Sequence, residues 1–275
     1  MSEVYLFKSF GQDKKKVADN KRLNKILWTI IIILIIVIIV EVVFQFLVAP
    51  NIRIENIFIE SELNLSKDEV LDLAGLTKSE YYFALNAQEI CDNLEKYPPV
   101  ALARVEKHFP STLKIKLWER KPLGCYLFKQ DKRHIPLLFD EKGMVFKIAQ
   151  GELSWDMPVI SGLKTQEVRI GKYLPDNLVN LVADLQRLRE ANSPLFDVLS
   201  EVELIPVSQR DFELAVYLIP YRTRLRLGDR INSGDIKYAL MMLDVLSQKG
   251  MDSPEHEIDF RTKEVVYRSK GGEGE

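Results

Sequence analysis

Cysteine is scarce in this 275-residue chain, which contains only Cys91 and Cys125. A small secreted domain held together by disulfides needs more cysteines, so that class of protein is excluded. One optional bridge and two buried thiols both fit the sequence, and we expect free thiols. No C-x-x-C pattern is present, and Cys91 falls within a predicted helix, not on a nucleophile turn.

Histidine is scarce as well, and the chain lacks the common catalytic motifs. His108, His134 and His256 are far apart and form no H-E-x-x-H pattern, so we interpret them as surface residues and predict no metal site. There is no G-x-S-x-G elbow and no phosphate-binding glycine loop. Carboxylate pairs such as Asp140 and Glu141 are expected in turns. The sequence therefore predicts no catalytic residue and no cofactor, and an anchored cell-wall hydrolase is the enzyme alternative.

One long apolar run, from Ile26 to Val48, dominates the N-terminal part. It exceeds the roughly 20 residues that cross a bilayer, and it has no polar face before Glu41. Insertion of the part up to Val40 should be favourable by roughly 5 kcal/mol. The run is too long for a signal peptide and ends without an A-x-A cleavage site, so we predict a retained transmembrane helix.

Charge is nearly balanced, with 38 basic and 40 acidic residues and a net charge of −2, so nothing points to nucleic acid. The basic residues near the run are nevertheless asymmetric, since only Arg53 follows it closely. By the positive-inside rule, the N-terminus is cytoplasmic and the rest of the chain is external. The basic residues that precede the run are Lys14, Lys15, Lys16, Lys21, Arg22 and Lys25.

Glu41 and Gln45 are polar exceptions near the outer end of the apolar run, four residues apart and hence on one helical face. We prefer the interpretation that both reach water at the membrane interface. The alternative is a polar seam that pairs with another membrane helix.

The segment after the anchor predicts the order strand, helix, helix, strand, strand. Residues 51–59 alternate as a half-buried strand does, and Ser66 to Glu69 has the form of a capping box whose helix ends at Gly75. A second helix begins near Asn86 and stops before Pro98. Residues 100–109 and 113–118 read as a hairpin. We expect a small sheet with both helices on one face.

The remaining part of the chain predicts a β-rich domain with two helices, which makes the whole an α+β protein. Helices are expected at 176–192 and 233–248, and 158–163 is expected to be a buried crossing segment. The predicted strands are 123–128, 137–139, 144–146, 198–205, 212–218, 223–227, 257–261 and 265–268. The predicted organisation is a cytoplasmic arm 1–25, a transmembrane helix 26–48, a first domain 50–121, a β domain 122–268 and a disordered tail 269–275.

This order of parts resembles the FtsQ/DivIB family of bacterial cell-division proteins over nearly the whole chain. The first domain resembles a POTRA domain, and the likeness rests on short segments found in the family's order. These segments are Leu65-Ser66, Tyr97-Pro98-Pro99-Val100, 109–115, Glu119-Arg120-Lys121-Pro122, 139–146, Leu225-Arg226-Leu227-Gly228 and Ile258-Asp259-Phe260-Arg261.

The resemblance implies a non-enzymatic scaffold of the division site in the cytoplasmic membrane. It also implies that FtsB/DivIC-like and FtsL-like partners bind the last strands of the β domain, and that an FtsK-like protein binds the POTRA domain. Thr262 replaces an aromatic residue of some relatives. An outer-membrane assembly factor would need POTRA repeats and a barrel, and a sensor would need a cytoplasmic output domain. The implied partner-binding residues are Ile258, Asp259, Phe260, Arg261, Val265, Val266, Tyr267 and Arg268.

Overall fold

The structure, a computed structural model, describes residues 16–48, 51–77, 80–130, 133–149, 157–162, 168–191, 194–208, 211–262 and 264–269. These residues fall into two compact units. The first is drawn from Met1–Ile57, Lys78–Asn86 and Lys107–Leu113, and the second from Phe58–Thr77, Ala87–Glu106 and Lys114–Glu275. Lys14, Lys15 and the predicted tail from residue 270 onward lie outside the described residues.

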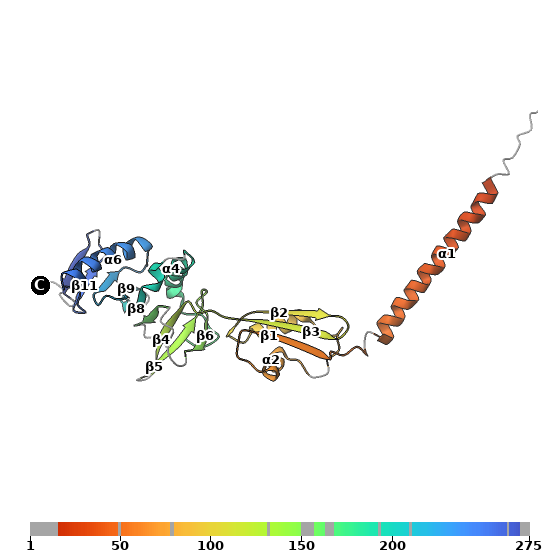
Figure 1. The fold of residues 1–275 in the computed structure, drawn as a ribbon, viewed down its shortest axis with the longest axis horizontal. Helices are drawn as coiled ribbons and strands as arrows, with labels where there is room; N and C mark the ends of the chain where they lie inside the picture. The colour runs from red at the N-terminus through yellow and green to blue at the C-terminus, as the bar shows by residue number, and fades with distance from the viewer. Residues whose placement is uncertain are drawn as a thin grey trace, which may run out of the picture. The chain divides into compact units, whose positions relative to one another are not determined.

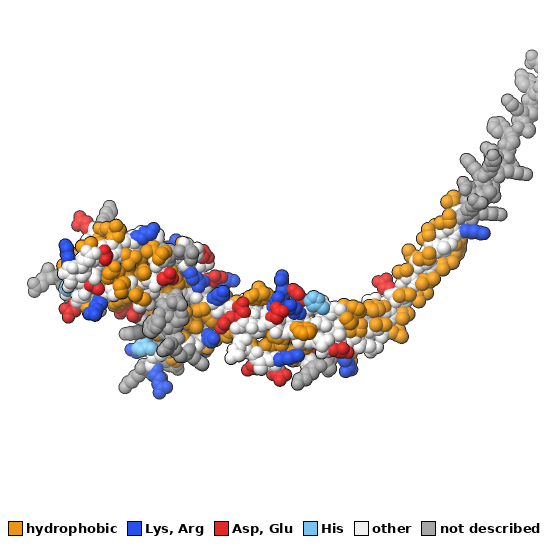
Figure 2. Space-filling model, viewed as in Figure 1, with side chains coloured by type: hydrophobic (Ala, Val, Ile, Leu, Met, Phe, Trp, Pro, Cys, Tyr) orange, Lys and Arg blue, Asp and Glu red, His pale blue; other side chains and the backbone are white. Residues whose placement is uncertain are grey.

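The apolar run forms a continuous helix. Helix α1 (Lys16–Val43) passes into the π-helical turn η1 (Phe44–Val48). The span Leu23–Val48 is long and apolar enough to cross a membrane, and none of it is buried within the protein. Figure 2 shows hydrophobic side chains along this helix. An exposed apolar surface of this length fits a lipid environment, as the sequence predicts.

The segment after the anchor forms a three-stranded sheet with two helices, in the predicted order strand, helix, helix, strand, strand (Figure 1). The strand order is β1-β3-β2, so the last strand in sequence lies in the middle of the sheet. Leu113, Ile115 and Leu117 of that strand are buried, because alternate side chains face the helices. The elements are β1 (Asn56–Ser61), α2 (Lys67–Ala74), α3 (Ala87–Glu95), β2 (Val100–His108) and β3 (Thr112–Glu119).

Local signals explain the first of these helices. The Ser66 Oγ accepts a hydrogen bond from the Glu69 backbone N–H at 3.3 Å, and a Glu69 carboxylate oxygen accepts from the Ser66 N–H at 2.7 Å. This reciprocal pair is the predicted capping box. Gly75 ends the helix in the left-handed region with φ +70°, a conformation that glycine adopts without steric cost.

The second part of the chain is one nine-stranded sheet in the order β12-β11-β10-β9-β8-β7-β4-β5-β6. Most neighbours are antiparallel, but β7 lies parallel to both β4 and β8, and β10 lies parallel to β11. The strands are β4 (Gly124–Gln130), β5 (Arg133–Phe139), β6 (Val145–Ile148), β7 (Val159–Ser161), β8 (Leu199–Pro206), β9 (Phe212–Leu218), β10 (Arg224–Leu227), β11 (His256–Asp259) and β12 (Val266–Ser269).

Helices cover one face of this sheet and build its core. Helix α4 (Val179–Glu190) follows the short turn η3 (Asp176–Leu178), α5 is Pro194–Asp197, and α6 is Ser233–Gln248. Apolar side chains of α4 and α6 form a single buried cluster with inward-facing strand residues such as Leu214, Val216 and Ile258. The other face of the sheet carries charged side chains on strands β9, β10 and β11, and several of them are buried against one another.

Most predicted elements occur, with differences at their ends. Helix α6 occupies the predicted residues 233–248 and β9 the predicted residues 212–218. The predicted helix 176–192 begins as a 3-10 turn, and a further short helix starts at Pro194. The crossing segment 158–163 contains a strand that completes the sheet. Ser269, assigned to the tail by the sequence, lies in β12.

Candidate functional site: the C-terminal edge of the large sheet

Strand β12 is an edge strand of the nine-stranded sheet, as the sequence predicts for the last strand. It pairs on one side with β11, in antiparallel register, and no other described strand pairs with it. The register places Asp259 opposite Val266, Ile258 opposite Tyr267 and Glu257 opposite Arg268. The second side of β12 therefore presents unpaired backbone groups, the arrangement that accepts an added strand.

The hydrogen-bond pattern of β11 determines which groups of β12 point outward. The Phe260 N–H donates to the Arg226 carbonyl oxygen at 2.8 Å, so residue 260 points toward β10. Backbone groups alternate in direction along a strand, so Ile258 also points toward β10 while Asp259 points toward β12. In an antiparallel pair, the backbone groups of two opposite residues point either toward each other or away from each other. Asp259 points toward β12, so the N–H and C=O of Val266 face β11, and those of Tyr267 face outward.

By the same alternation, the backbone of Arg268 pairs with β11 and that of Ser269 faces outward. Extended backbone before the strand would likewise turn the Val265 N–H outward. The outward N–H groups at the edge thus belong to alternate residues, whereas Val266 and Arg268 hold β12 to the rest of the sheet.

The side chains on the polar face form an arginine–carboxylate chain, defined here as Glu213, Arg224, Arg226, Glu257, Asp259, Arg261 and Arg268. Arg268 of β12 donates from Nε to a Glu257 oxygen at 2.9 Å and from Nη2 to an Asp259 oxygen at 2.8 Å. The other Glu257 oxygen accepts from Arg224 Nε at 2.9 Å. Arg268 therefore links the edge strand to both acidic residues of β11.

The arginine–carboxylate chain continues across the sheet through Arg261. Arg261 donates from Nη2 to Asp259 at 2.7 Å and from Nη1 to Glu213 of β9 at 2.7 Å. Glu213 also accepts from Arg226 Nη2 at 2.7 Å. Charges on four successive strands are thus joined in one continuous series, and planar guanidinium groups suit such paired contacts.

These contacts lower the pKa values of the carboxylates. Hydrogen bonds from Arg261 hold the pKa of Asp259 below its ordinary value, although burial opposes the shift. Burial alone would raise the pKa of Glu257, but hydrogen bonds from Arg224 and Arg268 outweigh it and the pKa is lowered. The pKa of Glu213 is lowered in the same way against burial by Arg226 and Arg261. All three groups are therefore ionised at neutral pH.

The predicted partner-binding residues fall into groups with different accessibility. Ile258 is fully buried in the core, and Asp259 is buried within the arginine–carboxylate chain, so neither side chain can contact a partner directly. Phe260 meets Tyr238 of α6 edge-on, with ring centroids 6.0 Å apart. Val266 and Arg261 remain exposed. The structure brings the eight residues to one edge, but only some of them face outward.

Tyr267 supports the edge strand from the core side. Its ring stacks on His256 with centroids 5.0 Å apart, and its hydroxyl donates to the Met251 carbonyl oxygen at 2.7 Å. Burial raises the pKa of Tyr267 above its ordinary value. Its side chain thus anchors β12, while its backbone faces outward.

Four members of the arginine–carboxylate chain are not among the residues that the sequence predicts for the site, namely Glu213, Arg224, Arg226 and Glu257. The signal was the alternation of charged and apolar residues in Arg224-Leu225-Arg226-Leu227 and Glu257-Ile258-Asp259. Such alternation places like side chains on one face of a strand. It does not reveal which strands are neighbours, so the ion pairs could not be derived from it.

Glu41 and Gln45 lie at the outer end of the apolar helix, where α1 passes into η1. Both side chains are exposed. Neither residue is part of the β12 edge.

Comparison with known proteins identifies the class of the first domain. Residues 52–120 match the family described as "POTRA domain, FtsQ-type". The chain is also similar to proteins named cell division protein FtsQ, and the resemblance to the FtsQ/DivIB family is thereby confirmed.

The similarities to individual relatives are moderate. The FtsQ of Geotalea daltonii is 28% identical over 42% of this chain and 40% of its own length. The FtsQ of Syntrophotalea carbinolica is 29% identical over 43% of this chain and 40% of its own length. That of Anaeromyxobacter sp. is 25% identical over 82% of this chain and 74% of its own length. The chain thus spans about two fifths of the length of the first two relatives.

Proposed function

We propose that this protein is a non-enzymatic scaffold of the bacterial cell-division machinery. Its FtsQ-type POTRA domain and its similarity to proteins named cell division protein FtsQ support this role. One helix would hold it in the cytoplasmic membrane, with Lys21, Arg22 and Lys25 on the cytoplasmic side. The folded domains would then be external, and the protein would gather at the division septum.

The proposed activity is the capture of a partner strand by β12. The open edge of that strand is the observation that carries the proposal, because edge strands are normally blunted unless they are used. FtsB/DivIC-like and FtsL-like proteins are the proposed partners at this edge. An FtsK-like protein is the proposed partner of the POTRA domain.

Proline substitutions test the proposal, since proline removes the one N–H that it replaces. Val266→Pro should lower the melting temperature because the Val266 N–H faces β11. Val265→Pro and Ser269→Pro should leave the melting temperature nearly unchanged but abolish capture of the FtsB/DivIC-like partner. Ser269 is the cleaner position of the two because its side chain is exposed.

The measurement is thermal melting beside pull-down, both made on the detergent-solubilised full chain. A Ser269→Pro protein that melts like the parent and still captures its partner would contradict docking at this edge. The scaffold role would then need another surface. Loss of capture in a protein with parental stability would support the edge.

A further inference from the structure

The end of the POTRA domain nearest the membrane anchor carries three exposed aromatic side chains. Tyr81, Phe83 and Phe109 are 40%, 48% and 63% exposed. Tyr81 and Phe83 lie in the connection between α2 and α3, and Phe109 follows β2. All three belong to the first compact unit, which also contains the apolar helix. We call this surface the aromatic tip.

Backbone and ring contacts hold the aromatic tip together. The Ile54 N–H donates to the Glu80 carbonyl oxygen at 2.9 Å, and the Tyr82 N–H donates to the Ile52 carbonyl oxygen at 2.9 Å. The buried ring of Tyr82 meets Phe83 and Phe109 edge-on, with centroids 5.2 and 6.1 Å apart. The exposed rings are therefore fixed on a folded support and do not project from a loose loop.

Two cations lie against aromatic rings of this surface, one against Tyr81 and one against the buried Tyr82. The Arg53 guanidinium is 5.3 Å from the centroid of the Tyr81 ring. The Lys107 ammonium is 4.9 Å from the Tyr82 ring and donates to the Leu85 carbonyl oxygen at 2.9 Å. Aromatic rings with cations beside them match the interfacial zone of a bilayer, where rings meet acyl chains and cations meet phosphates.

The aromatic tip is continuous with the anchor. Phe44 of η1 meets Phe83 edge-on, with centroids 6.2 Å apart. Asn51 donates from its side chain to the Leu47 carbonyl oxygen of η1 at 2.8 Å, so the residues before Arg53 also contact the end of the helix. Because the aromatic tip is covalently linked to the membrane helix, its effective concentration at the membrane surface is high.

We propose that the aromatic tip docks on the headgroup region of the membrane leaflet from which the helix emerges. The proposal rests on the membrane anchoring given under the proposed function. The occupant is phospholipid, and aromatic burial provides the contact. Glu55 and Glu80 offset the charges of Arg53 and Lys107 within the same unit, so anionic lipid is not required. Docking would restrain the POTRA domain at the membrane surface.

A fluorophore on the full chain in vesicles tests the proposal. Ala84→Cys places the label beside Phe83 and leaves every ring of the tip intact. Ala101→Cys is the matched control, because it is also an exposed alanine but lies toward the other end of β2, more than about 20 Å along the strand from His108. Val37→Cys lies near the middle of the apolar span and reports on the anchor through a second lipid whose quencher is in its acyl chain.

The natural cysteines allow this design with one replacement. Cys125 is buried, and burial raises the pKa of its thiol to about 11, so it remains protonated and protected from the label. Cys91 is only partly buried and is replaced by serine. The Cys91→Ser protein without a new cysteine should take up almost no label.

In phosphatidylcholine vesicles, a lipid with a quencher near its headgroup should quench the Ala84 label roughly threefold more than the Ala101 label. Exchange to phosphatidylglycerol should change this ratio little. Replacing Phe83 and Phe109 together by serine should reduce Ala84 quenching to the Ala101 level.

Each opposite result overturns the inference. Strong quenching of the Val37 label by the acyl-chain quencher, with equal, weak headgroup quenching at Ala84 and Ala101, would retain the anchor and reject the docked tip. Weak quenching of the Val37 label by the acyl-chain quencher, together with weak headgroup quenching at Ala84 and Ala101, would reject both the anchor and the docked tip. These two failures are therefore distinguishable.

Discussion

Arg120 and Asp140 are joined by a hydrogen bond of 2.5 Å from Arg120 Nη1 to an Asp140 carboxylate oxygen, and both side chains are largely withdrawn from water. Arg120 also donates from Nε to the Pro98 carbonyl oxygen and from Nη2 to the Val100 carbonyl oxygen, each at 2.9 Å. One guanidinium thus connects the end of the POTRA match with the turn after β5.

Replacement of Arg120 should be costly. Arg120→Ala removes the cation paired with the buried Asp140 carboxylate, which keeps the Lys142 and Met144 N–H donors at its other oxygen. We expect a loss of about 3 kcal/mol in the free energy of unfolding. Arg104→Ala is the control, because Arg104 is exposed and lies 3.9 Å from Glu106; it should change stability by less than about 0.5 kcal/mol. Urea unfolding of both proteins checks the prediction, and equal midpoints would contradict it.

Gly162 should not tolerate a side chain. Its φ is +95°, and a Cβ there would lie 2.2 Å from the Leu204 carbonyl oxygen. Gly162→Ala should therefore destabilise the protein by about 2 kcal/mol or more. Gly228→Ala is the matched control, since nothing lies within 4 Å of its Cβ position. Thermal melting distinguishes them, and a parental melting temperature for Gly162→Ala would show that β7 can shift.

Acid should weaken the arginine–carboxylate chain. The folded-state pKa values of Glu257 and Asp259 are lowered, so their contribution to stability is complete above the ordinary carboxyl values and is lost as pH falls through the lowered ones. At pH values below about 4.5, the melting temperature should therefore decrease. The double variant Glu257→Gln and Asp259→Asn should have a lower melting temperature at pH 7, and acidification should lower that melting temperature less than it does for the parent. An equal dependence of melting temperature on pH would argue against these two carboxylates as the cause.

Membrane topology can be read from fusions. A phosphatase that is active only outside the cytoplasm should be active when fused after Arg268 and inactive when fused to the N-terminus. The physical reason is the excess of basic residues before the apolar run. The reverse activity pattern would rule out the proposed orientation.

Glu41 and Gln45 can be tested together. If both side chains only reach the interface, replacing both by leucine should leave septal localisation and division unchanged. Fluorescence microscopy of a tagged full chain measures this outcome. Weaker recruitment despite better membrane insertion would instead support the polar seam with a partner helix.

Local sequence signals predicted the helices well because their causes are local. Ser66, Glu69 and Gly75 determine the ends of α2 through contacts within a few residues. Helix α6 likewise begins after the Asn232 side chain, which accepts from the Asp235 N–H at 2.8 Å. Each signal could be recognised without knowing the rest of the fold.

The pairing of distant strands could not be predicted in this way. Cys125 lies opposite Val159, and Ile160 opposite Val202, in a parallel arrangement that joins residues far apart in the chain. The short segment Val159–Ser161 has no turn signal that reveals its neighbours. The edge position of β12 was predicted, but the ion pairs of Arg268 depend on this long-range register.

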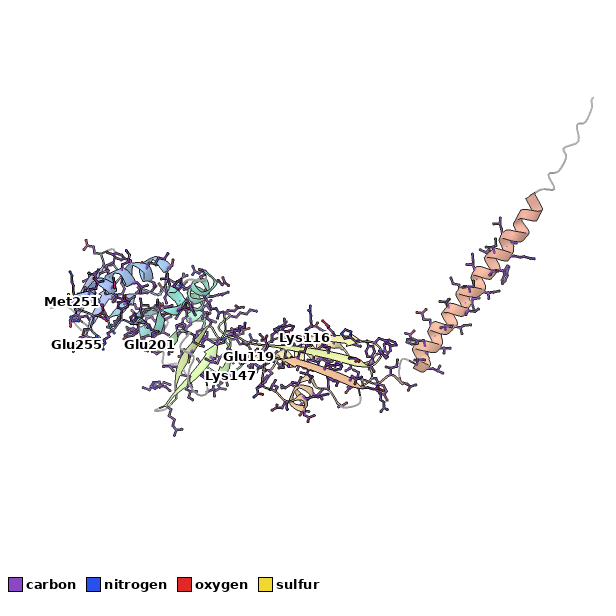
Figure 3. All side chains as sticks on the ribbon, in the orientation of Figure 1. Lys116, Glu119, Lys147, Glu201, Met251 and Glu255 are labelled. Carbon is purple, nitrogen blue, oxygen red and sulfur yellow. The ribbon has the colours of Figure 1, made fainter. Side chains whose placement is uncertain are left out.

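Contacts between charged side chains from separate strands share this limit. Lys147 of β6 and Glu119 of β3 form an ion pair at 3.4 Å (Figure 3). Nothing in the alternation of either strand indicates the other as its partner. Charge patterning identifies the wet face of a strand, and tertiary structure determines which opposite charge it meets.

The outward direction of the Tyr267 backbone has an evolutionary consequence for the proposed partner. Main-chain N–H and C=O groups are common to almost all residues, so an edge of this kind selects an extended conformation and places few demands on individual side chains. A binding strand could accumulate substitutions while keeping its register, with proline excluded at its pairing positions. Cognate partners from distant lineages could then share little sequence and still be interchangeable at this strand.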